Sequence, residues 1–200
     1  MKRGFLILLA VAILLPAGAA WVFLPPPDAE RAEALLQRAF AREEYDFILR
    51  AAVAADGAET PYFELTGSKS GDSSAVRGTV LGEEVELSFH DGVLTQILPD
   101  GSTANRELDP GELGALCAEL LPESAFAHQG LEATERRREG GRVILTLRPL
   151  ACSGWVGDYF RDPLYTVDCD LLCRRVRTLT LTATEKANGT AVLTLTVEFL

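Results

Sequence analysis

Apolar and polar residues alternate almost without exception near the C-terminus. From Leu179 to Thr184, leucine or alanine occupies every second position and threonine fills the positions between. The same alternation returns from Leu193 to Phe199. Successive side chains of a strand point to opposite faces, so the pattern predicts two strands that each bury one apolar face. Asn188-Gly189, between them, predicts a tight hairpin turn.

Shorter alternating stretches occupy the middle of the chain. Residues 61–108 carry short strand-like runs separated by glycine, aspartate and serine, and Asp91-Gly92 and Asp100-Gly101 predict two turns. Further strands are expected over residues 142–150 and 164–169. Residues 133–141 and 151–163 are expected to be irregular connections.

Two segments place apolar residues at helical spacing instead. Residues 28–57 predict one long helix, with Asp28 at its start and Gly57 after its end. Residues 108–123 predict a second helix that begins with an aspartate-proline capping signal. Helices and antiparallel strands in this order predict an α+β domain, a curved antiparallel sheet with helices against one face.

The N-terminus carries an uncharged apolar run from Gly4 to Leu24 after Lys2 and Arg3. Residues 1–24 have two interpretations, a cleaved signal peptide or a transmembrane anchor, and we favour the anchor because the run is long enough to span a bilayer. Residues 25–28 form a proline-rich spacer. Residues 29–200 are therefore predicted to be one extracytoplasmic domain, or a secreted one if the segment is cleaved.

The chain has 200 residues and a formal net charge of −10. This charge argues against a nucleic acid as a partner, because phosphates require a basic surface.

Four cysteines lie in the exported part of the chain, namely Cys117, Cys152, Cys169 and Cys173. An even number of cysteines outside the cytoplasm favours disulfides over free thiols. One expected pairing joins Cys169 to Cys173 and Cys117 to Cys152. A disulfide from Cys152 to Cys169 or to Cys173 is the open alternative. The spacing does not match a zinc site, so no metal is expected.

No combination of residues predicts catalysis. His90 and His128 are the only histidines, and neither belongs to a recognisable nucleophile–base pattern. We therefore expect no enzyme activity and no cofactor. The aromatic residues Trp155, Tyr159 and Phe160 share one loop, which is either a lid over an apolar cavity or a loop pinned to the core.

The order of these elements resembles the lipoprotein-carrier superfamily, which includes LolA-, LolB-, RseB- and LppX-like proteins. The block "YTVDCDLLCRRVRTLTLTATEKANGTAVLTLTVEF" carries the resemblance, in which a strand ends at Asp168 and a basic residue, Arg175, leads into a long Thr/Leu strand. The chain is also similar to single-anchor proteins of Firmicutes. The resemblance implies a half-open barrel with helices on its concave face and an apolar cavity for acyl chains, lipids or lipoproteins.

The function expected from these observations is a noncatalytic, membrane-tethered module that binds a lipid or another apolar ligand. The alternative is a structural or sensor module of the cell envelope whose core is filled by its own side chains and which docks a protein partner. The residues expected to line the cavity are apolar strand positions: Phe63, Leu65, Val85, Leu87, Phe89, Leu145, Leu147, Leu193, Leu195 and Val197.

Overall fold

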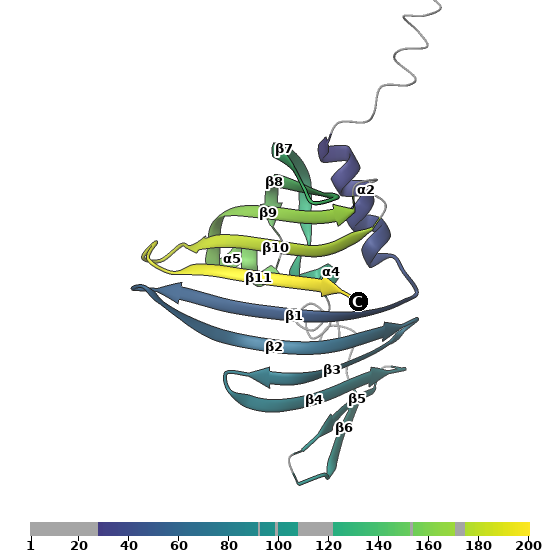
Figure 1. Ribbon diagram of the computed structural model, residues 1–200. Coiled ribbons are helices and arrows are strands. Elements are labelled where there is room, and N and C mark those ends of the chain that lie inside the picture. The colour runs from purple at the N-terminus through teal and green to yellow at the C-terminus, as the bar shows by residue number, and fades with distance from the viewer. Residues whose placement is uncertain (1–27, 92, 99, 108–121, 153, 171–174) are drawn as a thin grey trace, which may run out of the picture.

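The computed structural model describes residues 28–200 except 92, 99, 108–121, 153 and 171–174 (Figure 1). The helices are α2 (Asp28–Phe40), α4 (Pro122–Ala125) and α5 (Gly154–Tyr159). The strands are β1 (Glu44–Ala55), β2 (Ala58–Ser70), β3 (Ser73–Val80), β4 (Glu83–His90), β5 (Val93–Ile97), β6 (Thr103–Glu107), β7 (His128–Glu139), β8 (Arg142–Cys152), β9 (Phe160–Asp170), β10 (Val176–Glu185) and β11 (Val192–Phe199).

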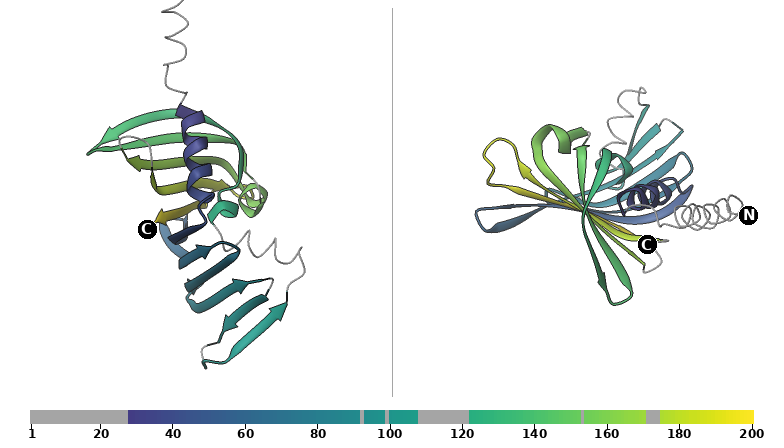
Figure 2. Two further views of the ribbon diagram at one scale, coloured as in Figure 1. Left: turned by 90° about the vertical axis from the view of Figure 1, so that its right-hand side faces the viewer. Right: turned by 90° about the horizontal axis from the view of Figure 1, so that it is seen from above.

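All the described strands belong to one antiparallel sheet in the order β6-β5-β4-β3-β2-β1-β11-β10-β9-β8-β7. Strands β1 to β6 follow one another as a meander, and β7 to β11 form a second meander. The two are joined where β1 pairs with β11, with Phe47 opposite Phe199 and Val53 opposite Leu193. The sheet is strongly twisted, and the described helices lie against one of its faces (Figure 2). We call this the inner face and the opposite one the outer face.

The predicted α+β architecture, a half-open barrel with helices on its concave face, is wrong. The described chain is mainly one large sheet that does not close, because β6 and β7 are its two unpaired ends. The described helices are short, with 13, 4 and 6 residues. Among the residues that the structure describes, no helix is long and apolar enough to cross a membrane. The predicted anchor (residues 1–24) and residues 25–27 of the predicted spacer lie outside the described part, whereas Asp28, the last residue of the predicted spacer, begins α2.

The main cause of this error is the segment predicted as one long helix. Only residues 28–40 are helical, and residues 44–55 form strand β1 instead. Tyr45, Phe47 and Leu49 are buried at every second position, and β1 has a paired neighbour on each side. Backbone pairing with two strands outweighs the helical propensity of its alanines and leucine.

Two predicted connections are also ordered. Residues 133–141, with three consecutive arginines, belong largely to β7, whose charged side chains suit an exposed sheet edge. Residues 151–163 contain α5 and the start of β9. The second predicted helix lies almost entirely at positions 108–121, outside the described residues, and the short helix α4 follows it. The alternation at 179–184 and 193–199 is confirmed, with the leucines inside.

Two glycines, Gly67 on β2 and Gly78 on β3, allow atoms of the neighbouring strand to approach them closely. A Cβ atom at Gly67 would lie 2.2 Å from Cζ of Phe47, whose ring covers this glycine. At Gly78 a Cβ would lie 2.0 Å from the carbonyl oxygen of Glu64, and its φ of +153° is rare for other residues. Both positions therefore require glycine, since a side chain at Gly67 would collide with β1 and one at Gly78 would collide with β2.

Candidate functional site

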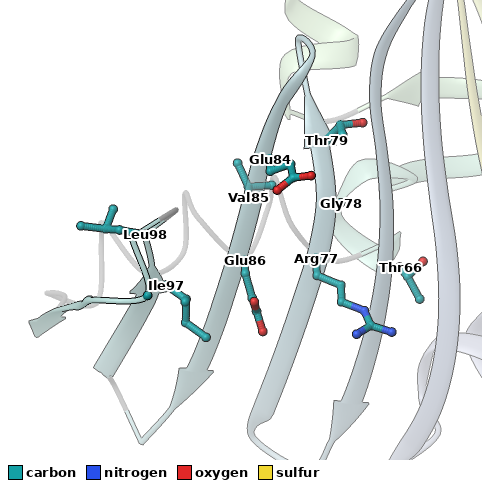
Figure 3. A pocket seen from close by; sticks show the side chains of 10 residues that line it. Thr66, Arg77, Gly78, Thr79, Glu84, Val85, Glu86, Ile97 and Leu98 are labelled. Atoms are coloured by element: carbon teal, nitrogen blue, oxygen red, sulfur yellow. The ribbon is translucent and has the colours of Figure 1, made fainter.

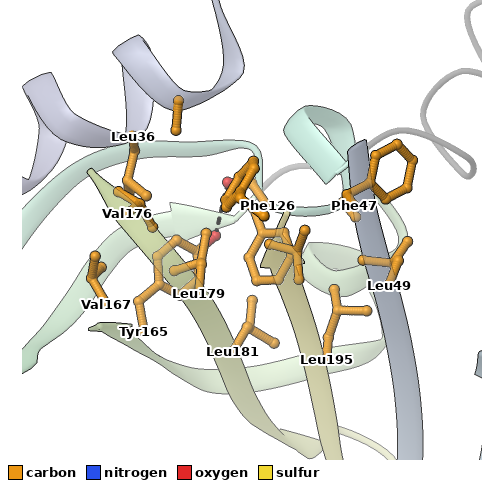
Figure 4. Close-up of a cluster of buried hydrophobic side chains, with 14 of the residues drawn as sticks. Leu36, Phe47, Leu49, Phe126, Tyr165, Val167, Val176, Leu179, Leu181 and Leu195 are labelled. Atoms are coloured by element: carbon orange, nitrogen blue, oxygen red, sulfur yellow. Dashed lines mark hydrogen bonds between the residues drawn. The ribbon is translucent and has the colours of Figure 1, made fainter. Parts of the chain in front are cut away.

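The inner face consists of two regions that differ in how well they are covered. We call β1 and β7–β11 the packed half, and β2–β6 the open half. In the packed half, the inner side chains interdigitate with α2, α4 and α5 into one apolar core (Figure 4). Leu35 and Leu36 of α2, Phe126 and Tyr165 are all at most 1% exposed. This half is filled by the protein's own side chains.

The open half continues the same face with less cover. Phe63, Val85, Leu87 and Phe89 are half-buried rather than buried. Leu94 of β5 lies opposite Phe89 and is also half-buried. Within this region Leu65 of β2 and Val76 of β3 are buried, at 3% exposed each. Strands β4 and β5, which lie farther from the packed half, have no buried residue among their described positions.

The ten predicted cavity residues all lie on the inner face, but the structure separates them into two groups. The residues of the packed half are core positions that are at most 1% exposed: Leu145, Leu147, Leu193, Leu195 and Val197. The residues of the open half lie on β2 and β4, with Gly78 and Val76 of β3 between the two strands: Phe63, Leu65, Val85, Leu87 and Phe89. Of the ten predicted residues, only the half-buried Phe63, Val85, Leu87 and Phe89 leave apolar surface for another molecule.

The predicted lid residues are placed on α5 and at the start of β9. Trp155 and Phe160 pack against the core of the packed half, and their rings meet edge to face at 5.9 Å. Tyr159 is 68% exposed. The three residues therefore do not lie over the open half as a group.

A polar cluster fastens α4 to the start of the sheet. The Tyr45 hydroxyl donates to Glu123 Oε2 at 2.5 Å, and Lys69 Nζ lies 2.7 Å from Glu123 Oε1. The Lys69 ammonium also lies 5.7 Å from the centre of the Tyr45 ring. Burial and the Glu123 carboxylate raise the pKa of Tyr45 far above its usual range. Sequence reasoning missed this cluster, because its members are far apart in the chain.

A second cluster lies under α2 in the packed half. His128 Nδ1 lies 2.9 Å from the Phe126 carbonyl oxygen, and Nε2 lies 3.4 Å from Glu33 Oε2. The Tyr165 hydroxyl donates to the same carbonyl at 3.0 Å. Burial raises the pKa of Tyr165 and also that of the neighbouring Cys152 thiol. Through Glu33 this cluster connects α2 to the start of β7, and through Tyr165 it reaches β9.

The cysteines make no disulfide with one another among the described residues. Cys152 lies opposite His128 at one end of β8, whereas Cys169 lies opposite Val143 near the other end. These positions are roughly 30 Å apart along the strand, so a disulfide between Cys152 and Cys169 is excluded. Cys117 and Cys173 lie outside the described residues. No group of His, Cys, Asp or Glu in the described part could hold a metal ion.

The hairpin between β3 and β4 carries an unusual exposed residue. Leu81 has a φ of +52° and is 65% exposed, and its backbone N–H donates to the Tyr62 carbonyl at 2.8 Å. Tyr62 is itself 46% exposed. At the same position of other two-residue turns the chain uses Asp56, Asp91 or Gly140, which tolerate positive φ better than leucine.

No protein-family model and no curated protein matches the sequence. Among solved structures, the chain is similar to a LolA superfamily protein, NE2245, from Nitrosomonas europaea, with 9% identity and a TM-score of 0.38 over 84% of this chain and 90% of the other. It is also similar to a DUF1329 family protein from Desulfovibrio piger ATCC 29098, with 7% identity and a TM-score of 0.33 over 88% and 92% of the two chains. The first neighbour bears the superfamily name that the sequence resemblance predicted. At TM-scores below 0.5, neither likeness establishes a common fold or function.

Proposed function

We propose that the chain is a noncatalytic binding module that holds an apolar ligand, such as an acyl chain, against the inner face of the open half. The observation that carries the proposal is the half-buried apolar row of Phe63, Val85, Leu87 and Phe89. Apolar side chains that keep part of their surface in water gain free energy when a ligand covers them, at about 25 cal/mol per Å². In the packed half the inward side chains of β8, β10 and β11 are buried by the protein itself, so they offer no such surface.

The chemistry of this row supports an apolar ligand over a polar one. The inward positions beside Val85 and Leu87 are leucine, valine or glycine on β2 and β3, whereas Phe89 lies beside Ser74 of β3, which is followed by Lys69 of β2. Charged residues such as Glu84, Glu86 and Arg77 alternate with these positions and therefore lie on the outer face. An extended hydrocarbon chain fits a continuous row of this kind.

Photolabelling of the full chain with a diazirine fatty acid tests this proposal. Labelled peptides are expected to contain Phe63, Leu87 or Phe89. Leu87→Asp should reduce the labelling at least tenfold, because it places a charge in the row. Ser88→Asp, on the outer face of the same strand, is the matched control and should leave labelling unchanged. Equal labelling of both variants, or labels confined to β7–β11, would contradict the proposal.

The second candidate function is a docking module for a protein partner, and one observation favours it. Leu81 places an exposed apolar side chain at a turn where its conformation is unfavourable, so stability does not explain its presence. A photoreactive amino acid at position 81, with position 192 as an exposed control, tests this role in cells. A single crosslinked protein from position 81 alone, combined with no fatty-acid labelling, would favour docking.

We further propose that residues 1–24 tether the domain to a membrane, with the domain on the extracytoplasmic side. Lys2 and Arg3 before an uncharged apolar run support this orientation, because positive residues stay in the cytoplasm. A C-terminal alkaline phosphatase fusion should be active and should remain with membranes after carbonate washing. An inactive fusion would contradict the orientation, and an active fusion released into the medium would indicate cleavage.

A further inference from the structure

A groove lies on the outer face of the open half, on the side opposite the proposed apolar site. It has a volume of about 590 Å³. Its floor contains a row of four residues on neighbouring strands, in which Thr66 lies opposite Arg77, Arg77 opposite Glu86 and Glu86 opposite Ile97 (Figure 3). Ile97 and Leu98, which follows it, provide an apolar wall.

The charged side chains in this row, Arg77 and Glu86, form no ion pair with the described part of the protein. Arg77 and Glu86 are direct cross-strand partners, yet no ion pair or hydrogen bond joins their side chains to any described residue. A cross-strand pair of the same type on β1 and β2 of the outer face is joined. Arg50 and Glu64, also direct partners, lie 3.0 Å apart. The groove, in contrast, presents an unpaired cation beside an unpaired anion among the described residues.

The balance of charges limits what the groove can bind. Glu84 also lines it, so two carboxylates accompany one guanidinium. A purely anionic ligand would meet two like charges, and a purely cationic one would leave Arg77 without a partner. A ligand that carries both an ammonium and an anionic group satisfies both sides. Neighbouring strands are about 4.8 Å apart, so the two groups need only a short chain between them.

We propose that the outer groove binds a small zwitterionic amphiphile. Its anionic group is held by Arg77, its ammonium by Glu86 and Glu84, and its carbon chain lies against Ile97 and Leu98. Guanidinium groups bind carboxylates and phosphates with paired hydrogen bonds, so the anionic group is one of these two. The same chemistry occurs in a free aminoalkanoate or short peptide and in an ethanolamine phosphate headgroup. Val85 lines this groove and also belongs to the proposed apolar site, but the charged residues that hold the zwitterion do not.

The test compares ligands that differ only in charge. The full chain in detergent micelles, labelled with ¹⁵N, is titrated with 5-aminopentanoate, pentanoate and pentylamine. The zwitterion is expected to shift the amide signals of Thr66, Arg77, Glu86 and Ile97 saturably, with a Kd at least tenfold lower than either singly charged compound. Arg77→Met and Glu86→Gln should each remove this advantage. Arg50→Met, at the paired site on the same face, is the matched control and should retain it.

A parallel titration with glycerophosphoethanolamine distinguishes the two sources of the ligand. Tighter binding of this compound than of 5-aminopentanoate assigns the groove to a headgroup, and the reverse assigns it to an amino acid or peptide. Equal affinity for pentylamine and 5-aminopentanoate would overturn the proposal, since it would reveal a simple acidic patch. No saturable shift with either zwitterion would also overturn it. Fatty-acid labelling of the inner face would be unchanged by Arg77→Met, so failure here is separable from failure of the proposed function.

Discussion

The packed half and the open half share one sheet and one alternating pattern, yet they differ in what lies against them. Leu145, Leu181 and Leu195 of the packed half are completely buried beneath helices and aromatic rings. In the open half, the Leu87 side chain also faces inward from its strand, but part of its surface remains exposed. Alternation determines which side chains face inward, but the elements packed on that face determine whether they become a core or a surface for binding.

The largest expected effect tests this difference with one substitution in each half. Leu181→Ala should lower the free energy of unfolding by about 3 to 4 kcal/mol, because it leaves a cavity in a filled core. Leu87→Ala should lower it by less than about 1.5 kcal/mol, because its surroundings are partly water. Urea denaturation followed by circular dichroism measures both values. Equal losses would mean that the open half is packed as tightly as the other.

The second largest expected effect is a loss of stability at alkaline pH, caused by the buried phenols of Tyr45 and Tyr165. The pKa of each is raised in the folded chain, so the unfolded chain releases the phenol proton first. Stability from these groups is fully present below the unfolded pKa of about 10 and is lost above it, by roughly 1.4 kcal/mol per group and pH unit. Tyr165→Phe should therefore flatten the decline between pH 10 and 11.

The matched control for this measurement is Tyr62→Phe. Tyr62 is 46% exposed in the open half, so this variant removes a phenol that lies outside the core. The same slope in Tyr165→Phe and in the original chain would show that this phenol is not protected by burial.

The smallest expected effect is a gain in stability from a substitution at the turn between β3 and β4. Leu81→Asn should raise the free energy of unfolding by about 1 kcal/mol, because asparagine tolerates the positive φ of this turn. Val192→Asn, at an exposed apolar position with ordinary backbone geometry, is the control and should give no gain. A loss of stability in Leu81→Asn, measured by thermal unfolding, would show that the leucine packs against the protein itself.

The strands were predictable where one face is apolar and the other carries threonine. Residues 179–184 and 193–199 have this pattern, and the hairpin signal at Asp91-Gly92 also matches the connection between β4 and β5. Strand β1 was not predictable in the same way. Its alanines and arginine favour a helix locally, and only its pairing with β2 and β11, distant in sequence, makes it a strand.

The candidate site was predictable only as a set of inward positions. The sequence identifies Leu87 and Leu195 as equivalent, because both alternate with polar residues. Whether helix α2 or water lies above each one depends on tertiary packing. The unpaired charges of Arg77 and Glu86 were likewise hidden, since their alignment depends on the register between β3 and β4.

The position of the last strand has a consequence for biosynthesis. Strand β11 comes last among the described strands in sequence and lies between β1 and β10, so both meanders depend on it for their connection. Strands β1 to β6 can pair in succession as the chain emerges, but β1 must wait for its second neighbour until β11 has been synthesised. Because this pairing joins residues about as distant as the domain allows, such as Phe47 and Phe199, it is expected to be slow. Until then the edge of β1 that later pairs with β11 is exposed, and a chaperone that protects this edge would act in the interval between the synthesis of β1 and that of β11.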